Sequence, residues 1–255
     1  MQTLEPRVFY AYIPYKNQDY LPNFDSAVND FSFAQMLTEN RFSGGDRIND
    51  ANRTTVALTS RFVEQDTGVE FLRLAVGQQF NFNDPRVLLP NTPLNPQVTS
   101  GKSDFIAAIS GRLTQNIRTD SNIQMDESKL WIEKVRTGIS YQPETGKVIN
   151  FGYRFTRDVL EQVDTSFQWP ITGNWHGVAR ANYSLKDDKL LAGLAGFEYN
   201  ACCWALRVVL QRLTTATQTT TTAFFVQLEL KGLMGIGNNP LQVLQQSIPG
   251  YTSVY

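Results

Sequence analysis

Long runs of alternating apolar and polar residues are the feature that most constrains the fold of this chain. In residues 148–155, Ile149 and Phe151 fall on one face of an extended backbone, and Asn150 and Arg154 fall on the other. Side chains of a β-strand alternate in this way. Similar runs, separated by turn-forming clusters such as PETGK and KDDK, recur along most of the chain. The sequence therefore predicts an all-β protein.

The length of the runs distinguishes between kinds of β protein. Strands of soluble proteins usually span about 5–6 residues, whereas most runs here span roughly 10–14, enough to cross a bilayer at a tilt. Aromatic residues stand near many run ends, as in the interfacial girdles of membrane barrels: Tyr10, Tyr12, Phe80, Phe82, Trp131, Tyr141, Trp169, Trp175, Tyr199 and Trp204. These features favour a membrane barrel over a soluble β-sandwich, whose strands also alternate.

We expect an antiparallel transmembrane β-barrel portion of about 12 long strands, half of a larger barrel. The expected strands are 5–15, 53–64, 69–82, 103–114, 117–126, 129–142, 147–157, 160–170, 174–186, 189–199, 202–213 and 222–234. Long connections of such barrels are extracellular and short ones are periplasmic, which places the long connection 16–52 outside and both chain ends in the periplasm. The barrel portion is then 1–239, followed by a periplasmic tail, 240–255, in which 240–248 forms a short helical turn.

The connection 16–52 is too apolar for a solvated loop. It contains Phe24, Phe31, Phe33, Met36, Leu37 and Phe42. We expect it to fold over the barrel mouth or into the lumen and to be partly helical near 26–37. Gly44 and Gly45 permit a tight turn, and Asp46 and Arg47 are a candidate internal ion pair.

Charge and hydropathy exclude two classes of protein. The 23 Lys and Arg residues nearly balance the 24 Asp and Glu residues, so the basic excess of a general nucleic-acid binder is absent. No run of 18 apolar residues exists, which argues against transmembrane helices. The opening residues MQTLEPRVFY show no basic region followed by an apolar run, so we expect the export signal to lie on an N-terminal region outside this sequence.

Cys202 and Cys203 are adjacent and are the only cysteines. Their Cα atoms would lie about 3.8 Å apart, below the usual disulfide span of about 4.4–6.8 Å, and in a strand they would point to opposite faces. We therefore expect partners on another segment or chain, with two small buried apolar residues as the alternative interpretation. A metal site is poorly supported, because there is one histidine and no second cysteine pair.

Four ordered segments resemble the LptD family of lipopolysaccharide-assembly proteins. They are LEPRVFYAYIPY (4–15), FSGGDRINDANRTTVALTSRF (42–62), YNACCWALRV (199–208) and FFVQLELKGL (224–233). The resemblance implies the C-terminal half of a barrel of about 26 strands, preceded in the family by a periplasmic jellyroll domain. It also implies that Cys202 and Cys203 form disulfides with cysteines of the N-terminal region.

The resemblance implies lipopolysaccharide transport in the Gram-negative outer membrane, with no cofactor and no bond chemistry. Acyl chains would leave through a lateral seam between the first and last strands, where Phe224, Val226, Leu228 and Leu230 face lipid and Gln227, Glu229 and Lys231 face the lumen. Polar residues of the lumen wall would contact the enclosed LptE lipoprotein plug or sugar phosphates: Arg73, Gln79, Arg154, Arg180 and Arg207. An LptA-type periplasmic bridge would deliver the lipid to the N-terminal domain.

Three other functions fit parts of the sequence. A stand-alone porin-type channel has similar strands, but it would need its own export signal and would have no use for a cysteine pair. An outer-membrane phospholipase would need a histidine and a serine together on the lipid face, yet His176 lies on the polar face of its strand. A soluble sandwich module would be monomeric without detergent, whereas the long edges of a half-barrel favour aggregation.

Overall fold

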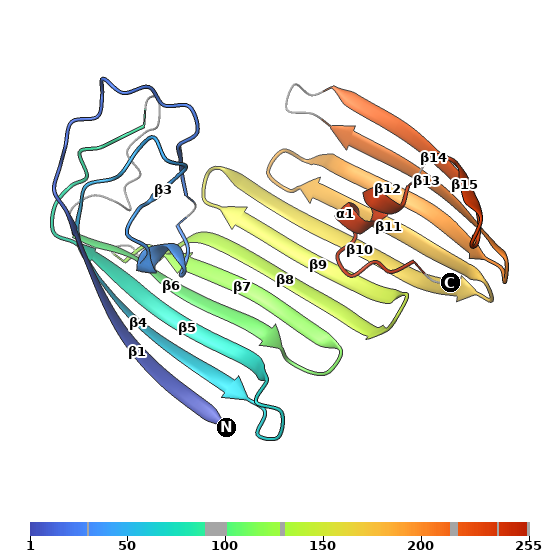
Figure 1. Cartoon of the computed structure of the whole chain (residues 1–255), viewed down its shortest axis with the longest axis horizontal. Helices are drawn as coiled ribbons and strands as arrows, with labels where there is room; N and C mark the ends of the chain where they lie inside the picture. The colour runs from blue at the N-terminus through green and yellow to red at the C-terminus, as the bar shows by residue number, and fades with distance from the viewer. Residues whose placement is uncertain (30, 90–100, 128–130, 215–218, 239, 254–255) are drawn as a thin grey trace. The chain divides into compact units, whose positions relative to one another are not determined.

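The computed structural model of the chain describes residues 1–29, 31–89, 101–127, 131–214, 219–238 and 240–253. Across these residues, thirteen strands form one sheet in the order β1-β4-β5-β6-β7-β8-β9-β10-β11-β12-β13-β14-β15, with hydrogen bonds between neighbours (Figure 1). Pairing is antiparallel from β1 to β6 and from β9 to β15. The expected all-β class is confirmed.

The strands are β1 (Gln2–Ile13), β4 (Ala51–Val63), β5 (Glu70–Asn81), β6 (Gly101–Arg112), β7 (Ile117–Met125), β8 (Ile132–Glu144), β9 (Lys147–Thr156), β10 (Leu160–Thr172), β11 (Trp175–Ser184), β12 (Lys189–Asn200), β13 (Trp204–Thr214), β14 (Thr220–Leu230) and β15 (Met234–Gly237). The twelve expected strands correspond in order to β1 and to β4 through β14. Parts of the expected connection 84–102 and of the expected strand 129–142 lie outside the described residues. No helix among the described residues is both long enough and apolar enough to span a bilayer.

The chain divides into two compact units. Unit 1 comprises Met1–Gly111 and Ser121–Val135, and unit 2 comprises Arg112–Asp120 and Arg136–Tyr255. In unit 1, Ala57 of β4 faces Arg7 of β1 and Gly77 of β5. Each unit has its own pattern of buried and exposed side chains, described separately below.

In both units, burial is reversed relative to a soluble sheet. In unit 1, Arg53, Thr55 and Gln79 are buried on one face, while Val8, Val56 and Val76 are exposed on the other. In unit 2, Gln168, Glu198 and Arg207 are buried, while these apolar side chains are exposed: Ile149, Phe151, Phe167, Phe197, Leu210 and Phe224. We call the two surfaces of the strands in each unit the polar face and the apolar face. A soluble sandwich would bury the apolar set, so that alternative is wrong.

The connection before β4 packs on the polar face of unit 1. The Thr55 hydroxyl donates to the Met36 carbonyl at 2.7 Å, and the Arg53 guanidinium donates to the Thr38 carbonyl at 2.8 Å. Met36 is only 1% exposed. The connection therefore folds back onto the polar face of its own unit; that this face lines a barrel lumen stays a prediction.

Helical structure in this connection is shorter than expected. Within the predicted segment 26–37, a 3-10 helix covers only Gln35–Leu37, and Ala27–Val28 forms β2, which pairs with β3 (Phe42–Ser43). The side chain of Asn23 bonds both the N–H and the C=O of Ser26. Such bonds compete with helix formation, which explains why the helix does not start earlier.

The turn before β4 is present, but the expected ion pair is not. Gly44 has φ of 75°, and a Cβ there would lie 2.5 Å from the Asp25 carboxylate. Asp46 accepts the backbone N–H groups of Phe24 and Asp25 at 2.6 and 2.8 Å. Arg47 instead donates to backbone carbonyls of 21 and 22. Backbone N–H groups of the loop therefore bind Asp46, and backbone carbonyls bind Arg47, in place of the predicted ion pair.

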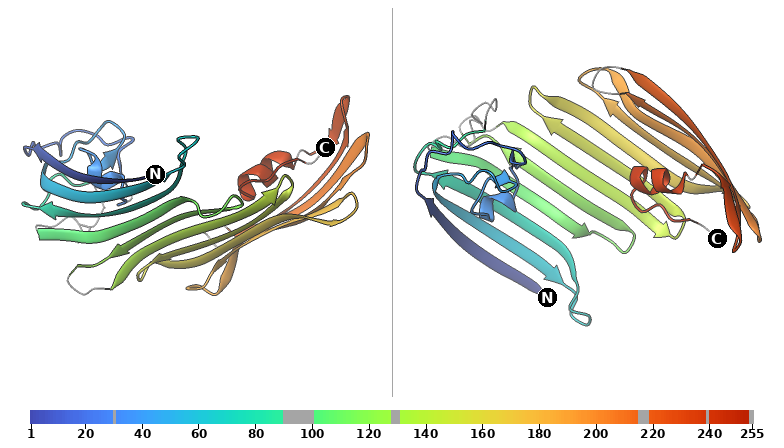
Figure 2. Two further views of the ribbon diagram at one scale, coloured as in Figure 1. Left: turned by 90° about the horizontal axis from the view of Figure 1, so that it is seen from below. Right: turned by 45° about the horizontal axis from the view of Figure 1, so that its top comes forward.

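The predicted strand 222–234 is too long at its C-terminal end. Strand β14 stops at Leu230, a turn containing Gly232 at φ of 80° follows, and β15 pairs back on Gln227–Leu230. The expected helical segment of the tail is confirmed as α1 (Leu241–Ser247). Figure 2 shows α1 lying against one face of the unit 2 strands.

The tail packs on the polar face of unit 2. Leu244 and Ile248 are fully buried in a cluster with side chains of four strands: Val148, Val178, Leu194 and Val209. These four valine and leucine residues are the apolar part of an otherwise polar face. The tail thus covers the apolar residues that would otherwise face water.

Candidate functional site

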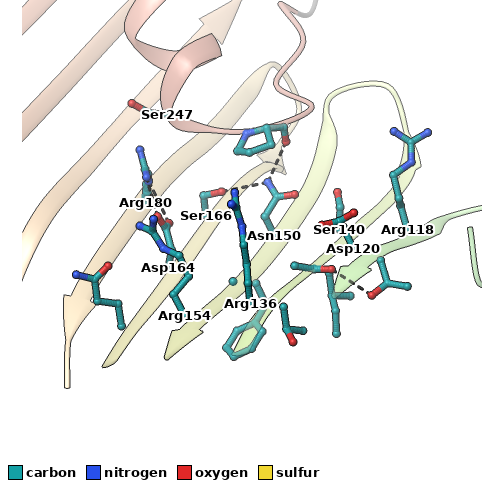
Figure 3. Close-up of a pocket in the computed structure, with 18 of the residues that line it drawn as sticks. Arg118, Asp120, Arg136, Ser140, Asn150, Arg154, Asp164, Ser166, Arg180 and Ser247 are labelled. Atoms are coloured by element: carbon teal, nitrogen blue, oxygen red, sulfur yellow. Dashed lines mark hydrogen bonds and ion pairs between the residues drawn. The ribbon is translucent and has the colours of Figure 1, made fainter. Parts of the chain in front are cut away.

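A cavity of about 460 Å³ lies on the polar face of unit 2, beside the end of α1 (Figure 3). Strands β7 to β11 contribute its floor, and Gln246, Ser247 and Pro249 of the tail line one side. The charged residues that line it are Arg118, Asp120, Arg136, Arg154, Asp164 and Arg180. All of these residues belong to unit 2.

One ion pair in the cavity is tightly made. Arg180 of β11 donates from Nε and Nη2 to the two carboxylate oxygens of Asp164 in β10, at 3.0 and 2.6 Å. Asn182 adds a third hydrogen bond to Asp164 at 3.2 Å. Because the carboxylate of Asp164 neutralises the charge of Arg180, Arg180 attracts an anionic ligand less than the other arginines of the cavity do.

A second, more buried network lies beneath the tail. Arg207 of β13 is 1% exposed and contacts Glu198, which is 2% exposed, at 3.2 Å. Its guanidinium also reaches Gln227 at 3.2 Å and Glu229 at 2.5 Å. Tyr251 of the tail donates to Glu198, and burial beside this carboxylate raises the pKa of the Tyr251 hydroxyl. A buried charge pair needs such additional partners to offset its loss of water.

The tail backbone is held by side chains of the sheet. Gln168 donates to the Thr252 carbonyl at 2.8 Å and accepts its N–H at 3.1 Å. Arg207 donates to the Ser253 hydroxyl at 2.9 Å. Asn150 donates to the Pro249 carbonyl at 2.9 Å. These contacts seat residues 249–253 in one position on the polar face.

The structure places the four candidate lumen arginines on polar faces but does not gather them into one site. Arg154 and Arg180 line the cavity, whereas Arg207 belongs to the buried network. Arg73 lies in unit 1, where it pairs with Glu70 at 2.8 Å and keeps 45% of its side chain exposed. Gln79, also expected on the lumen wall, is buried beneath the loop. Their shared role as lumen contacts remains a prediction.

Sequence reasoning missed Arg118, Arg136 and Glu198 as site residues. The period-two pattern that identified Arg154 and Arg180 also places Arg118 with Asp120, on alternate positions of β7. It gave no sign of Tyr251 as the partner of Glu198, because the two residues are 53 positions apart.

The cysteines lie in a turn and not at the start of a strand. Strand β13 begins at Trp204, and the Ala201 N–H donates to the Trp204 carbonyl at 2.9 Å, which closes the connection. Both thiols are free and exposed, and their Sγ atoms are 2.7 Å apart. The expectation that they point to opposite faces is therefore wrong, because turn geometry turns both side chains to one side. Their hydrogen bond raises the pKa of the Cys203 thiol.

Strand β14 has the two faces that the sequence predicted. Phe224, Val226 and Leu228 are exposed on the apolar face, with Phe224 at 62%, and Gln227 is buried on the polar face. Leu230 is partly buried. The assignment of this strand to a lateral seam stays a prediction.

Aromatic residues gather where three strands of unit 2 begin or end. The ring centroids of Trp175 and Tyr199 are 4.9 Å apart, and those of Tyr199 and Trp204 are 5.0 Å apart. Amphipathic rings in such a row are typical of the membrane-water interface. His176 follows Trp175 but turns to the polar face, where it is 9% exposed and opposite Glu198. The lipid-face histidine of a phospholipase is therefore not formed by this residue.

Comparison with known proteins finds one matching family. The family model described as "LptD: LPS transport system D" matches residues 1–175. Relatives named "LPS-assembly protein LptD" include those of Nitrosomonas eutropha, with 64% identity over 98% of this chain and 34% of the relative, and of Nitrosospira multiformis, with 64% over 98% and 26%. The relative from Thiobacillus denitrificans has 52% identity over 98% and 34%. The chain spans about a third or less of the length of these relatives.

Proposed function

The chain belongs to the LPS transport system D family, and from this premise we propose that it forms part of the outer-membrane translocon that inserts lipopolysaccharide into the outer leaflet. Sugars do not enter hydrocarbon and acyl chains do not enter water without a large cost in free energy. A wall that is apolar on one face and polar on the other serves both parts of such a lipid, provided that it opens at a seam.

The observation that carries this proposal is the reversed burial of the sheet. In unit 2, Phe167, Phe197 and Phe224 are exposed on the apolar face, while Glu198 and Arg207 are buried on the polar face. Water would not stabilise this arrangement, but a bilayer on one side and a hydrated lumen on the other would. Family membership favours lipopolysaccharide assembly over a stand-alone channel, which the same two faces would also allow.

We place one side of the lateral seam on β14; the other side would be the first strand of the whole barrel, in the half that precedes this chain. Among the described residues, the pairing of β15 on this edge covers Gln227–Leu230. Residues 220–226 are then the part of the edge that would meet the opposite side of the seam. Phe224 and Val226 are exposed on the apolar face there, next to the path of the acyl chains.

The other parts of the translocon are proposals that rest on the family. The polar face would enclose the LptE lipoprotein plug, and a domain outside this chain would receive lipid from an LptA-type bridge. The exposed thiols of Cys202 and Cys203 are accessible to cysteines of such an outside region, with which they would form disulfides. An export signal on the same region would direct the protein to the outer membrane.

The apolar face of β14 provides a test in the intact protein. Phe224→Asp with Leu228→Asp should block assembly into the outer membrane, because a charge facing lipid costs about 2–4 kcal/mol near the bilayer centre for basic residues and somewhat less for acidic ones. Thr221→Asp, on the polar face of the same strand, is the matched control and should assemble. Assembly is measured by membrane fractionation, and delivery by the amount of lipopolysaccharide at the cell surface. Normal delivery in cells depleted of the intact protein would refute the transport role.

The loop on the polar face of unit 1 is proposed to act as a lid. Its contacts with Thr55 and Arg53 hold it over this face. Deleting 24–45 from the intact protein should reduce delivery of lipopolysaccharide without reducing the amount of assembled protein. Wild-type delivery by the deletion variant would count against a functional lid.

A further inference from the structure

The cavity beside α1 carries more positive charge than its own carboxylates balance. Four arginines and two aspartates line it, and Arg180 is committed to Asp164. Arg118, Arg136 and Arg154 have no ion-pair or hydrogen-bond partner among the described residues. Asp120 is the remaining carboxylate, so the lining keeps a surplus of two positive charges. An anion is the complementary ligand.

The guanidinium groups are directed to one side of the sheet. Figure 3 shows the side chains of Arg136, Arg154 and Arg180 rising from the strands toward the tail. Arg136 belongs to β8 and Arg154 to β9, which are neighbours in the sheet. A planar guanidinium offers paired N–H donors that match the oxygens of a phosphate, and two of them from adjacent strands can share one phosphate.

The rest of the lining offers neutral hydrogen-bonding side chains. Ser140, Gln162 and Ser247 line the cavity beside the arginines. Asn150 donates to the Ser166 hydroxyl at 3.1 Å and to the Pro249 carbonyl at 2.9 Å, which fixes this side of the cavity. Hydroxyl and amide groups both donate and accept hydrogen bonds, which suits the hydroxyls of a sugar.

We propose that this cavity binds a phosphate-bearing saccharide, with its phosphate on Arg136 and Arg154 and its hydroxyls on the serine and glutamine side chains of the lining. The inference rests on the proposed function, which would bring such a saccharide along the polar face. The volume of about 460 Å³ suits one or two sugar rings, since small-molecule sites commonly measure about 300–1,000 Å³. The site is a resting point for the head of the lipid and takes no part in bond chemistry.

Calorimetric titration of the intact protein in detergent tests the proposal. The probes are the deacylated core oligosaccharide of lipopolysaccharide and the same oligosaccharide after phosphatase treatment. The wild-type protein should bind the phosphorylated probe about tenfold or more tightly than the other, since a hydrogen bond to a charged group contributes at least that factor. Arg136→Gln with Arg154→Gln should abolish the preference. Arg7→Gln with Arg61→Gln removes the same charge from unit 1, outside the cavity, and should keep it.

The outcomes separate this inference from the proposed function. Equal binding of the two probes by the wild-type protein, or equal loss in both double variants, would overturn the cavity site. A third result would also overturn it: the Arg136→Gln with Arg154→Gln variant keeps the preference for the phosphorylated probe but loses a co-purifying acidic protein. The two arginines would then bind a protein and not a sugar. If delivery of lipopolysaccharide to the cell surface still depends on the intact protein, the proposed function stands even though the cavity site is refuted. A gel-mobility assay of unheated samples confirms that each variant is folded.

Discussion

Replacing Arg207 by alanine should destabilise unit 2 by about 3–5 kcal/mol, the range seen when one partner of a buried ion pair is removed. The side chains of Arg207 and Glu198 are 1% and 2% exposed. Without the guanidinium, Glu198 stays buried and keeps only the hydrogen bonds from Tyr251 and Gln168. Gln227 loses a hydrogen bond as well. The loss therefore comes mainly from an uncompensated buried charge.

Arg73→Ala is the matched control for this prediction. Arg73 also makes two contacts with a carboxylate, at 2.8 and 3.1 Å to Glu70, but its side chain is 45% exposed. Water replaces such a partner, so the cost should be about 0–1 kcal/mol. The assay is unfolding of the intact protein by guanidinium chloride in detergent, with tryptophan fluorescence as the signal.

A double variant distinguishes the loss of charge balance from the loss of packing. Glu198→Gln with Arg207→Met removes both charges and keeps much of the side-chain volume, so it should recover most of the stability lost in Arg207→Ala. The reasoning is refuted if Arg207→Ala and Arg73→Ala differ by less than about 1 kcal/mol, a gap smaller than the two ranges allow. It also fails if the double variant is no more stable than Arg207→Ala.

Three further perturbations test other contacts. Leu244→Ala should loosen the tail at a cost of about 2–5 kcal/mol, because this side chain is fully buried, and limited proteolysis should then cleave within 240–253. Gly237→Ala should detach β15, since a Cβ there would lie 2.2 Å from the Val226 carbonyl oxygen, and faster hydrogen exchange at Leu228, whose N–H faces β15, would report it. The backbone N–H groups of Asp25 and Phe24 lower the pKa of Asp46, so its stabilising effect on the loop is present above the ordinary carboxyl pKa of about 4 and is lost as pH falls through the lowered value. Acid should therefore increase proteolysis of the loop before β4, and Asp46→Asn should show this sensitivity at neutral pH.

The strands and their faces could be predicted because they depend on local information. Side chains alternate with a period of two whatever the partner strand, so the run 147–157 alone predicts β9 and the exposed Phe151. The hairpin at Gly232 was missed because the apolar pattern continues through Leu233 and Met234. A turn in such a run is decided by the φ of one glycine, which the alternation does not report.

The contacts of the site could not be predicted in the same way. Gln168 bonds Thr252 across 84 positions of sequence, and Arg207 bonds Ser253 across 46. No period in the sequence links such residues, because their proximity follows from where the tail docks. The turn around Cys202 has the same cause, since the end of β12 and the start of β13 set it jointly.

In each unit, an irregular segment satisfies the polar groups that the sheet buries. In unit 1 the Met36 carbonyl accepts from Thr55, and in unit 2 residues 252 and 253 satisfy Gln168 and Arg207. Covering a polar face with the protein's own backbone lowers the cost of burial without a second sheet. The cavity lies where the tail ends this cover, at Pro249, and there Arg136 and Arg154 keep unused donors. Gln168 and Arg207 of this face are satisfied by the protein itself, whereas these two guanidinium groups are not. Their unused donors are the physical reason to look for an anionic sugar at this position.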